Sequence, residues 1–165
     1  MKILMIVVLY FVSIKFIHAN NQNIYHYSAN NPESGVVNIS IDISPPVVYI
    51  GHAGRGANLC KYDDIFYCIN SIPFSFSVPK SSLKCNLSWE KNGRQYKIIR
   101  LEDMVSLGGK FSVYVIEGRK SGKIDALYYY SDSNGLIGFY LFEDNSFSSL
   151  YIINGNKGFP IISSN

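Results

Sequence analysis

Three segments of the chain alternate strictly between apolar and polar side chains, and this alternation constrains the fold more than any other feature. The segments are Val37–Ile43, Phe74–Val78 and Leu83–Glu90. Successive side chains on a β-strand point to opposite faces, so a period of two places the apolar residues on one face and the polar residues on the other. Sheets with one face in water are mostly antiparallel. The pattern therefore predicts antiparallel strands.

Turn-forming residues separate further strand-like segments at short intervals. Asn92-Gly93 is typical of a two-residue type I′ turn and predicts a hairpin between Leu83–Lys91 and Arg94–Leu101. A short helix over Leu101–Leu107 is an alternative for the residues that follow. The second half of the chain contains four more candidate strands, namely Phe111–Glu117, Ile124–Tyr130, Leu136–Phe142 and Phe147–Ile153. This spacing predicts an all-β fold, either an antiparallel sandwich or a small barrel with a C-terminal meander.

The first nineteen residues have the three-part composition of a signal peptide. Lys2 provides a positive charge, Ile3–Ile14 are almost entirely apolar, and Ala19 provides a small residue at the expected cleavage site. A membrane-spanning helix needs about 20 apolar residues, so the sequence favours cleavage over an uncleaved anchor. We therefore expect an exported protein, periplasmic or extracellular, with no stable membrane span after cleavage.

The remaining chain is expected to form one domain. Residues 20–35 are polar and rich in turn-forming residues, which predicts a loose N-terminal arm, and residues 36–165 form the single all-β domain. Loss of Lys2 and Lys15 with the signal peptide lowers the formal net charge from +3 to about +1. The remaining lysines and arginines are scattered singly, so the sequence argues against nucleic-acid binding.

Three cysteines in an exported chain allow one disulfide and leave one thiol. Cys60 and Cys68 flank a short polar turn, so they are the expected pair. Cys85 shares the apolar parity of Leu83 and Trp89, which predicts a free, buried thiol. A bridge to Cys85, or no bridge, are the alternatives. No Cys-x-x-Cys spacing occurs and the histidines lie far away, so no metal site is expected, and no motif indicates a cofactor.

Two segments offer weak candidates for binding. The glycine-rich stretch Gly51–Asn58 contains His52 and Arg55, and its backbone N–H groups could hold an anion, although a flexible loop explains the same composition. The run Tyr128–Tyr130 must place at least one ring on the face opposite its neighbours. Tyr129 on that face could contact a sugar or a peptide, although packing within the sheet is the simpler interpretation.

No catalytic signature occurs in the sequence. The leading hypothesis is therefore a non-enzymatic binding or interaction module with a protein or carbohydrate ligand. One alternative is a small secreted hydrolase that uses His52 and dispersed acidic residues. The other is an outer-membrane β-barrel, which needs strands of about 9–11 residues, longer than the strands expected here.

Overall fold

The protein folds into two antiparallel β-sheets, as seen in a computed structural model that describes residues 24–30, 38–72, 74–143 and 146–160. No helix occurs in these ranges, so the prediction of an antiparallel all-β fold is confirmed. The predicted signal peptide lies outside the described residues. The strands are β1 (Ile24–Ala29), β2 (Ile39–Ile43), β3 (Pro46–Ile50), β4 (Ala53–Gly56), β5 (Asn58–Leu59), β6 (Phe66–Asn70), β7 (Ser75–Pro79), β8 (Ser88–Lys91), β9 (Arg94–Ser106), β10 (Gly109–Lys120), β11 (Lys123–Ser131), β12 (Gly135–Glu143) and β13 (Ser146–Ile153).

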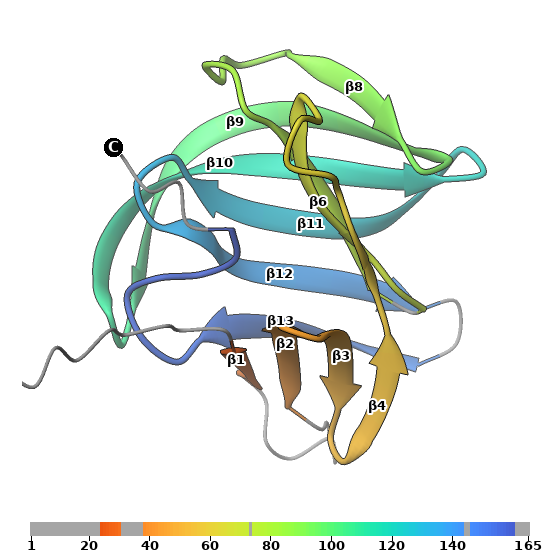
Figure 1. Cartoon of the computed structure of the whole chain (residues 1–165). Helices are drawn as coiled ribbons and strands as arrows, with labels where there is room; N and C mark the ends of the chain where they lie inside the picture. Colours follow the sequence, from red (N-terminus) through yellow and green to blue (C-terminus); the bar gives the residue numbers. More distant parts are fainter. Residues whose placement is uncertain (1–23, 31–37, 73, 144–145, 161–165) are drawn as a thin grey trace, which may run out of the picture.

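The larger sheet has ten strands and the smaller has three. The order in the large sheet is β4-β3-β2-β1-β13-β12-β11-β10-β9-β8, and the small sheet is β5-β6-β7. The large sheet curves into a trough, with β6 of the small sheet passing across β9 to β12 (Figure 1). Strands β9 to β13 follow one another as neighbours, so the predicted C-terminal meander is present.

The prediction of a loose arm over residues 20–35 is wrong for Ile24–Ala29. These residues form β1, which pairs with both β13 and β2. Tyr25 and Tyr27 are buried on alternate positions, and the hydroxyl of Tyr27 donates a hydrogen bond to the carbonyl of Leu136 over 3.0 Å. The two tyrosines supply enough apolar area to bury the strand despite their polar neighbours.

Two other segments differ from the sequence predictions. Leu101–Leu107 is not helical, because β9 continues to Ser106 and pairs with β10 along its length. The glycine-rich stretch Gly51–Asn58 is not a flexible loop. Gly51 and His52 form the turn of the β3–β4 hairpin, with Gly51 at a φ of 58°, and after Ala57 the chain passes from the large sheet into β5 of the small sheet.

Strand β7 fills the trough and forms the centre of the core. The ring of Phe76 lies 5.0 Å from that of Tyr128 and 6.0 Å from that of Tyr130, measured between centroids, and Phe74 lies 4.7 Å from Phe139. The polar residues of β7 are buried as well, with Ser77 at 0% exposure. The expectation of a solvent-facing side on this strand is therefore wrong, because the large sheet curves around it.

A buried polar network connects the two sheets. The Arg94 guanidinium donates to the carboxylate of Asp125 over 2.8 Å and to the hydroxyl of Tyr128 over 3.1 Å. The Tyr128 hydroxyl in turn donates to the backbone carbonyl of Ser75 on β7. A buried polar group without a partner destabilises the folded state. These linked hydrogen bonds therefore fix the position of β7 against β9 and β11.

Cys60 and Cys68 form a disulfide with their Cα atoms 5.1 Å apart, so the predicted pairing is confirmed. The prediction of a buried Cys85 is wrong, because Cys85 is exposed. Strand β8 begins only at Ser88, and the preceding residues form a turn in which the Leu87 N–H donates to the Lys84 carbonyl over 3.1 Å. The turn interrupts the alternation that placed Cys85 on the inner face.

Truncation of Phe76 tests the role of β7. Phe76→Ala is expected to lower the free energy of unfolding by about 3–5 kcal/mol, because it opens a cavity between Tyr128 and Tyr130. Leu107→Ala is a suitable control, since Leu107 is 97% exposed and its loss should change stability by no more than about 0.5 kcal/mol. Urea denaturation measures both values, and similar values for the two variants would contradict the central position of β7.

The buried tyrosines predict unfolding at alkaline pH. Burial raises the pKa of Tyr96 from its ordinary value of 10.0 to about 12, and it also raises the pKa values of Tyr27, Tyr128 and Tyr130. The folded state therefore keeps protons that the unfolded chain releases, so this stabilisation is complete below pH 10 and is lost as the pH rises towards 12. Tyrosinate absorbance of these residues should appear together with the loss of near-ultraviolet circular dichroism. If these four tyrosines ionise fully while the near-ultraviolet circular dichroism spectrum stays unchanged, they are not buried as described.

The arrangement of the cysteines predicts selective alkylation. In the native oxidised protein iodoacetamide should modify Cys85 alone, because its thiol is exposed, whereas Cys60 and Cys68 should react only after reduction. Peptide mapping without reductant identifies both products. A Cys85 that reacts only in denaturant would contradict the exposure of its thiol in the turn before β8.

Candidate functional site

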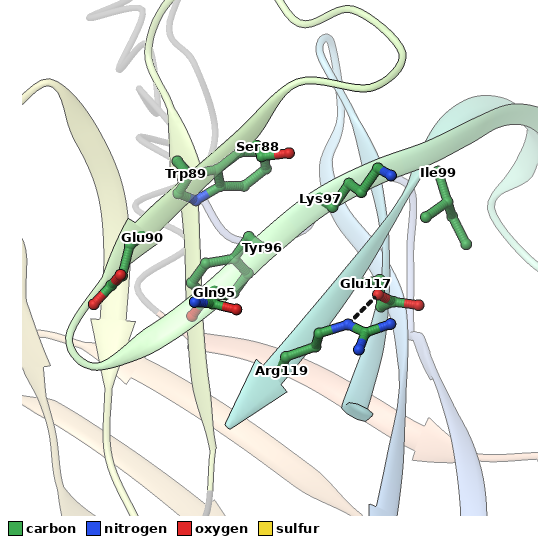
Figure 2. A pocket seen from close by; sticks show the side chains of 9 residues that line it. All are labelled: Ser88, Trp89, Glu90, Gln95, Tyr96, Lys97, Ile99, Glu117 and Arg119. Carbon is green, nitrogen blue, oxygen red and sulfur yellow. Dashed lines mark hydrogen bonds and ion pairs between the residues drawn. The ribbon is translucent and has the colours of Figure 1, made fainter. Parts of the chain in front are cut away.

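A groove of about 560 Å³ lies on the outer face of the large sheet, across β8, β9 and β10 (Figure 2). Two rows of side chains cross these strands in register. The first row is Ser88, Lys97 and Glu117, and the second is Glu90, Gln95 and Arg119. Side chains directly opposite each other on neighbouring strands lie about 4.5–5.5 Å apart at Cβ, so each row forms a continuous polar line.

The charges in the groove balance. Two of the six side chains are acidic and two are basic. The Nε of Arg119 donates to Oε1 of Glu117 over 2.6 Å (dashed line in Figure 2). The Nη1 of Arg119 donates to the carbonyl of Gly122 over 3.4 Å. These contacts hold the guanidinium plane against the sheet. The Glu117 side chain is only 13% exposed, whereas that of Arg119 is 43% exposed and accessible to a ligand.

Trp89 and Tyr96 also border the groove. Their rings stack at an interplanar angle of 10°, with centroids 5.4 Å apart. Tyr96 is buried, and Trp89 is half-buried and packs against the core, on the side that the alternation of apolar residues indicates. Strand β8 is the edge of the sheet, and none of the described strands lies beyond it to cover the indole.

An apolar strip continues the outer face beyond the groove. Along the line of the first row, Glu117 is followed by Leu127 on β11 and then by Tyr140 on β12, its cross-strand neighbours. Tyr129 lies on the same face, opposite to its buried neighbours in the sequence, and burial raises its pKa, with a further contribution from Glu102. The strip is therefore aromatic and half-buried.

The structure separates the three binding residues that the sequence suggested. His52 is exposed at the turn between β3 and β4, and Arg55 lies on β4, at one edge of the large sheet. Tyr129 lies on β11, with β3, β2, β1, β13 and β12 between it and β4. Tyr129 is therefore not on a strand adjacent to the one that carries Arg55.

Sequence reasoning missed both rows of the groove and one further contact. The Nδ1 of His26 lies 2.8 Å from the hydroxyl of Ser40, a distance typical of a base next to a nucleophile. The two residues are cross-strand partners on β1 and β2 and lie on an exposed sheet face. The part of the groove on β8 and β9 could have been predicted from the Asn92-Gly93 turn, because a two-residue turn places Glu90 opposite Gln95.

Within the described parts of the chain, no group of three or more His, Cys, Asp or Glu residues is close enough to hold a metal ion. In the same ranges, no helix has the length and apolar character needed to cross a membrane. Comparison of the chain with protein-family models, with curated proteins and with solved structures found no match in any of the three.

Proposed function

We propose that the protein is a non-enzymatic binding module that holds a neutral, polyhydroxylated ligand, a carbohydrate, in the groove on β8, β9 and β10. One observation carries this proposal: six polar side chains stand in two registered rows that include both donors and acceptors and have no net charge. The volume of about 560 Å³ lies within the range of about 300–1,000 Å³ that is typical of small-molecule sites.

The balance of charge supports a neutral ligand. Nucleic acids and other polyanions are bound by surfaces on which Lys and Arg predominate. Here Glu90 and Glu117 offset Lys97 and Arg119. A hydroxyl group can donate one hydrogen bond and accept others, so it suits a surface that offers both kinds of partner.

The shapes of the polar groups support the same ligand class. Arg119 presents a planar fork of N–H donors, and the Gln95 amide has a donor and an acceptor side by side. Neighbouring hydroxyls on a sugar ring can satisfy such paired groups together. The apolar C–H face of a sugar ring can also lie against Tyr140 and Leu127, which lie beyond Glu117 in the first row.

We also propose that the module acts outside the cytoplasm. The Cys60–Cys68 disulfide supports this proposal, because disulfides persist mainly in oxidising compartments. The signal-like composition of the first nineteen residues is in agreement with it.

The alternative of a small hydrolase has one specific observation in its favour, the His26–Ser40 contact. That pair lies on an open sheet face, away from the groove, and His52 lies on the β3–β4 turn. A fluorophosphonate probe that labels Ser40, but not the Ser40→Ala variant, would support the hydrolase.

Intrinsic fluorescence can test the carbohydrate proposal, because Trp89 is the only tryptophan and borders the groove. Titration with chitohexaose, cellohexaose, maltohexaose and mannohexaose is expected to change the emission for at least one of them. Arg119→Met should weaken that binding at least tenfold, because it removes a bidentate donor, which corresponds to about 1.4 kcal/mol.

Lys84→Gln is the matched control, since it removes one exposed positive charge outside the groove and should leave the affinity unchanged. The Arg119 side chain is 43% exposed, so Arg119→Met should change the melting temperature only slightly. Absence of binding to all four oligosaccharides, or equal affinity of Arg119→Met, would overturn the proposal. Tighter binding of heparin than of any neutral oligosaccharide would do so as well.

A further inference from the structure

Strand β4 ends the large sheet opposite to β8, and the pairing of β4 with β3 determines what its free edge presents. The N–H of Ala57 donates to the carbonyl of Pro46 over 3.0 Å, and Ile50 and Ala53 close the two-residue turn. Hydrogen-bonded and non-hydrogen-bonded pairs alternate along an antiparallel ladder. Gly54 and Gly56 therefore direct their N–H and C=O groups away from β3, towards the open edge.

The groups at this edge are mostly without partners among the described residues. The Gly56 carbonyl accepts a hydrogen bond from the Ser71 hydroxyl over 3.1 Å, which confirms that it points outward. No described residue bonds the N–H or C=O of Gly54 or the N–H of Gly56. A chain laid alongside β4 can therefore form main-chain hydrogen bonds here.

The glycine at position 56 has no explanation within the fold. Its φ is not positive, and a Cβ added there would meet nothing within 4 Å. Gly54 differs, because a Cβ there would approach the Tyr49 ring to 2.9 Å. Glycine within a strand often marks a place where another backbone approaches closely, and Gly56 fits that description.

The inner side of the same edge opens into a cavity of about 610 Å³ that Ile50, Arg55 and Ile72 border. Arg55 is opposite the buried Val48, so its side chain lies on the core-facing side of the sheet, and it forms no ion pair with any described residue. Ile72 is 85% exposed. An unpaired cation and an exposed apolar side chain thus border one cavity beside an open strand edge.

We propose that β4 binds an extended peptide segment of another protein, which adds to the sheet as an antiparallel strand. The segment carries an acidic residue opposite Arg55 and an apolar residue two positions away, on the same face, against Ile50 and Ile72. Strand addition of this kind takes its affinity from main-chain hydrogen bonds and its specificity from alternate side chains. A second copy of β4 fits less well, because Gly51–Gly56 contain no acidic residue to pair with Arg55.

The test uses the full chain and a fluorescein-labelled peptide, Thr-Val-Thr-Asp-Thr-Val-Thr, in fluorescence anisotropy titrations. The peptide is expected to bind, and Arg55→Glu should lower its affinity at least tenfold while raising the affinity for the same peptide with Lys in place of Asp. Lys84→Glu is the matched control and should change neither value. A peptide that is N-methylated at both residues flanking Asp should not bind, because it has lost the main-chain donors.

Equal affinities for the Asp and Lys peptides, or no binding of either peptide, would overturn the proposal. The role of Arg55 would then be to protect the edge of the sheet from aggregation. A concentration-dependent dimer in sedimentation that Arg55→Glu abolishes would overturn it in favour of a second copy. The inference is independent of the carbohydrate groove, because Arg55→Glu should leave oligosaccharide binding unchanged whatever that binding is.

Discussion

The packing of β7 into the trough of the large sheet is the interaction on which the rest of the structure depends. Phe74 and Phe76 contact rings on β11 and β12, and the Tyr128 hydroxyl bonds the backbone of Ser75. The inner face of the large sheet is therefore used mostly for the core, except at β4, which is exposed. Its outer face has no covering layer in the described parts of the chain, so the polar and aromatic side chains that face outward there are available for binding.

The alternation of side chains predicted the meander well, because the strands from β9 to β13 follow one another as neighbours in the sheet, and β10 and β11 each have one dominant buried face. It failed where a second element covers the polar face. Ser75 and Ser77 are buried because the trough surrounds β7, and no periodicity within five residues contains that information. It also failed at Cys85, since a turn shifts the parity within an otherwise regular pattern.

The candidate groove was predictable only in part. The Asn92-Gly93 turn fixes the register of β8 against β9, which brings Ser88 next to Lys97. The third strand is different, because β9 and β10 pair along more than ten residues with a register shift between Val115 and Ile116. A shift of one residue moves every later side chain to the other face, so the positions of Glu117 and Arg119 required the structure.

The groove and the core are coupled through a single glycine. Gly118 lies between Glu117 and Arg119, and a Cβ at this position would approach the ring of Tyr128 to 2.9 Å. The close approach of Tyr128 to β10 lets its hydroxyl reach both Arg94 and Ser75. The same approach fixes the backbone on either side of Gly118, and so the direction in which the two groove side chains point outward. A binding surface whose side chains are held by a rigid backbone loses less conformational entropy on binding, so for the proposed ligand the buried network beneath the groove would contribute to affinity without contacting it.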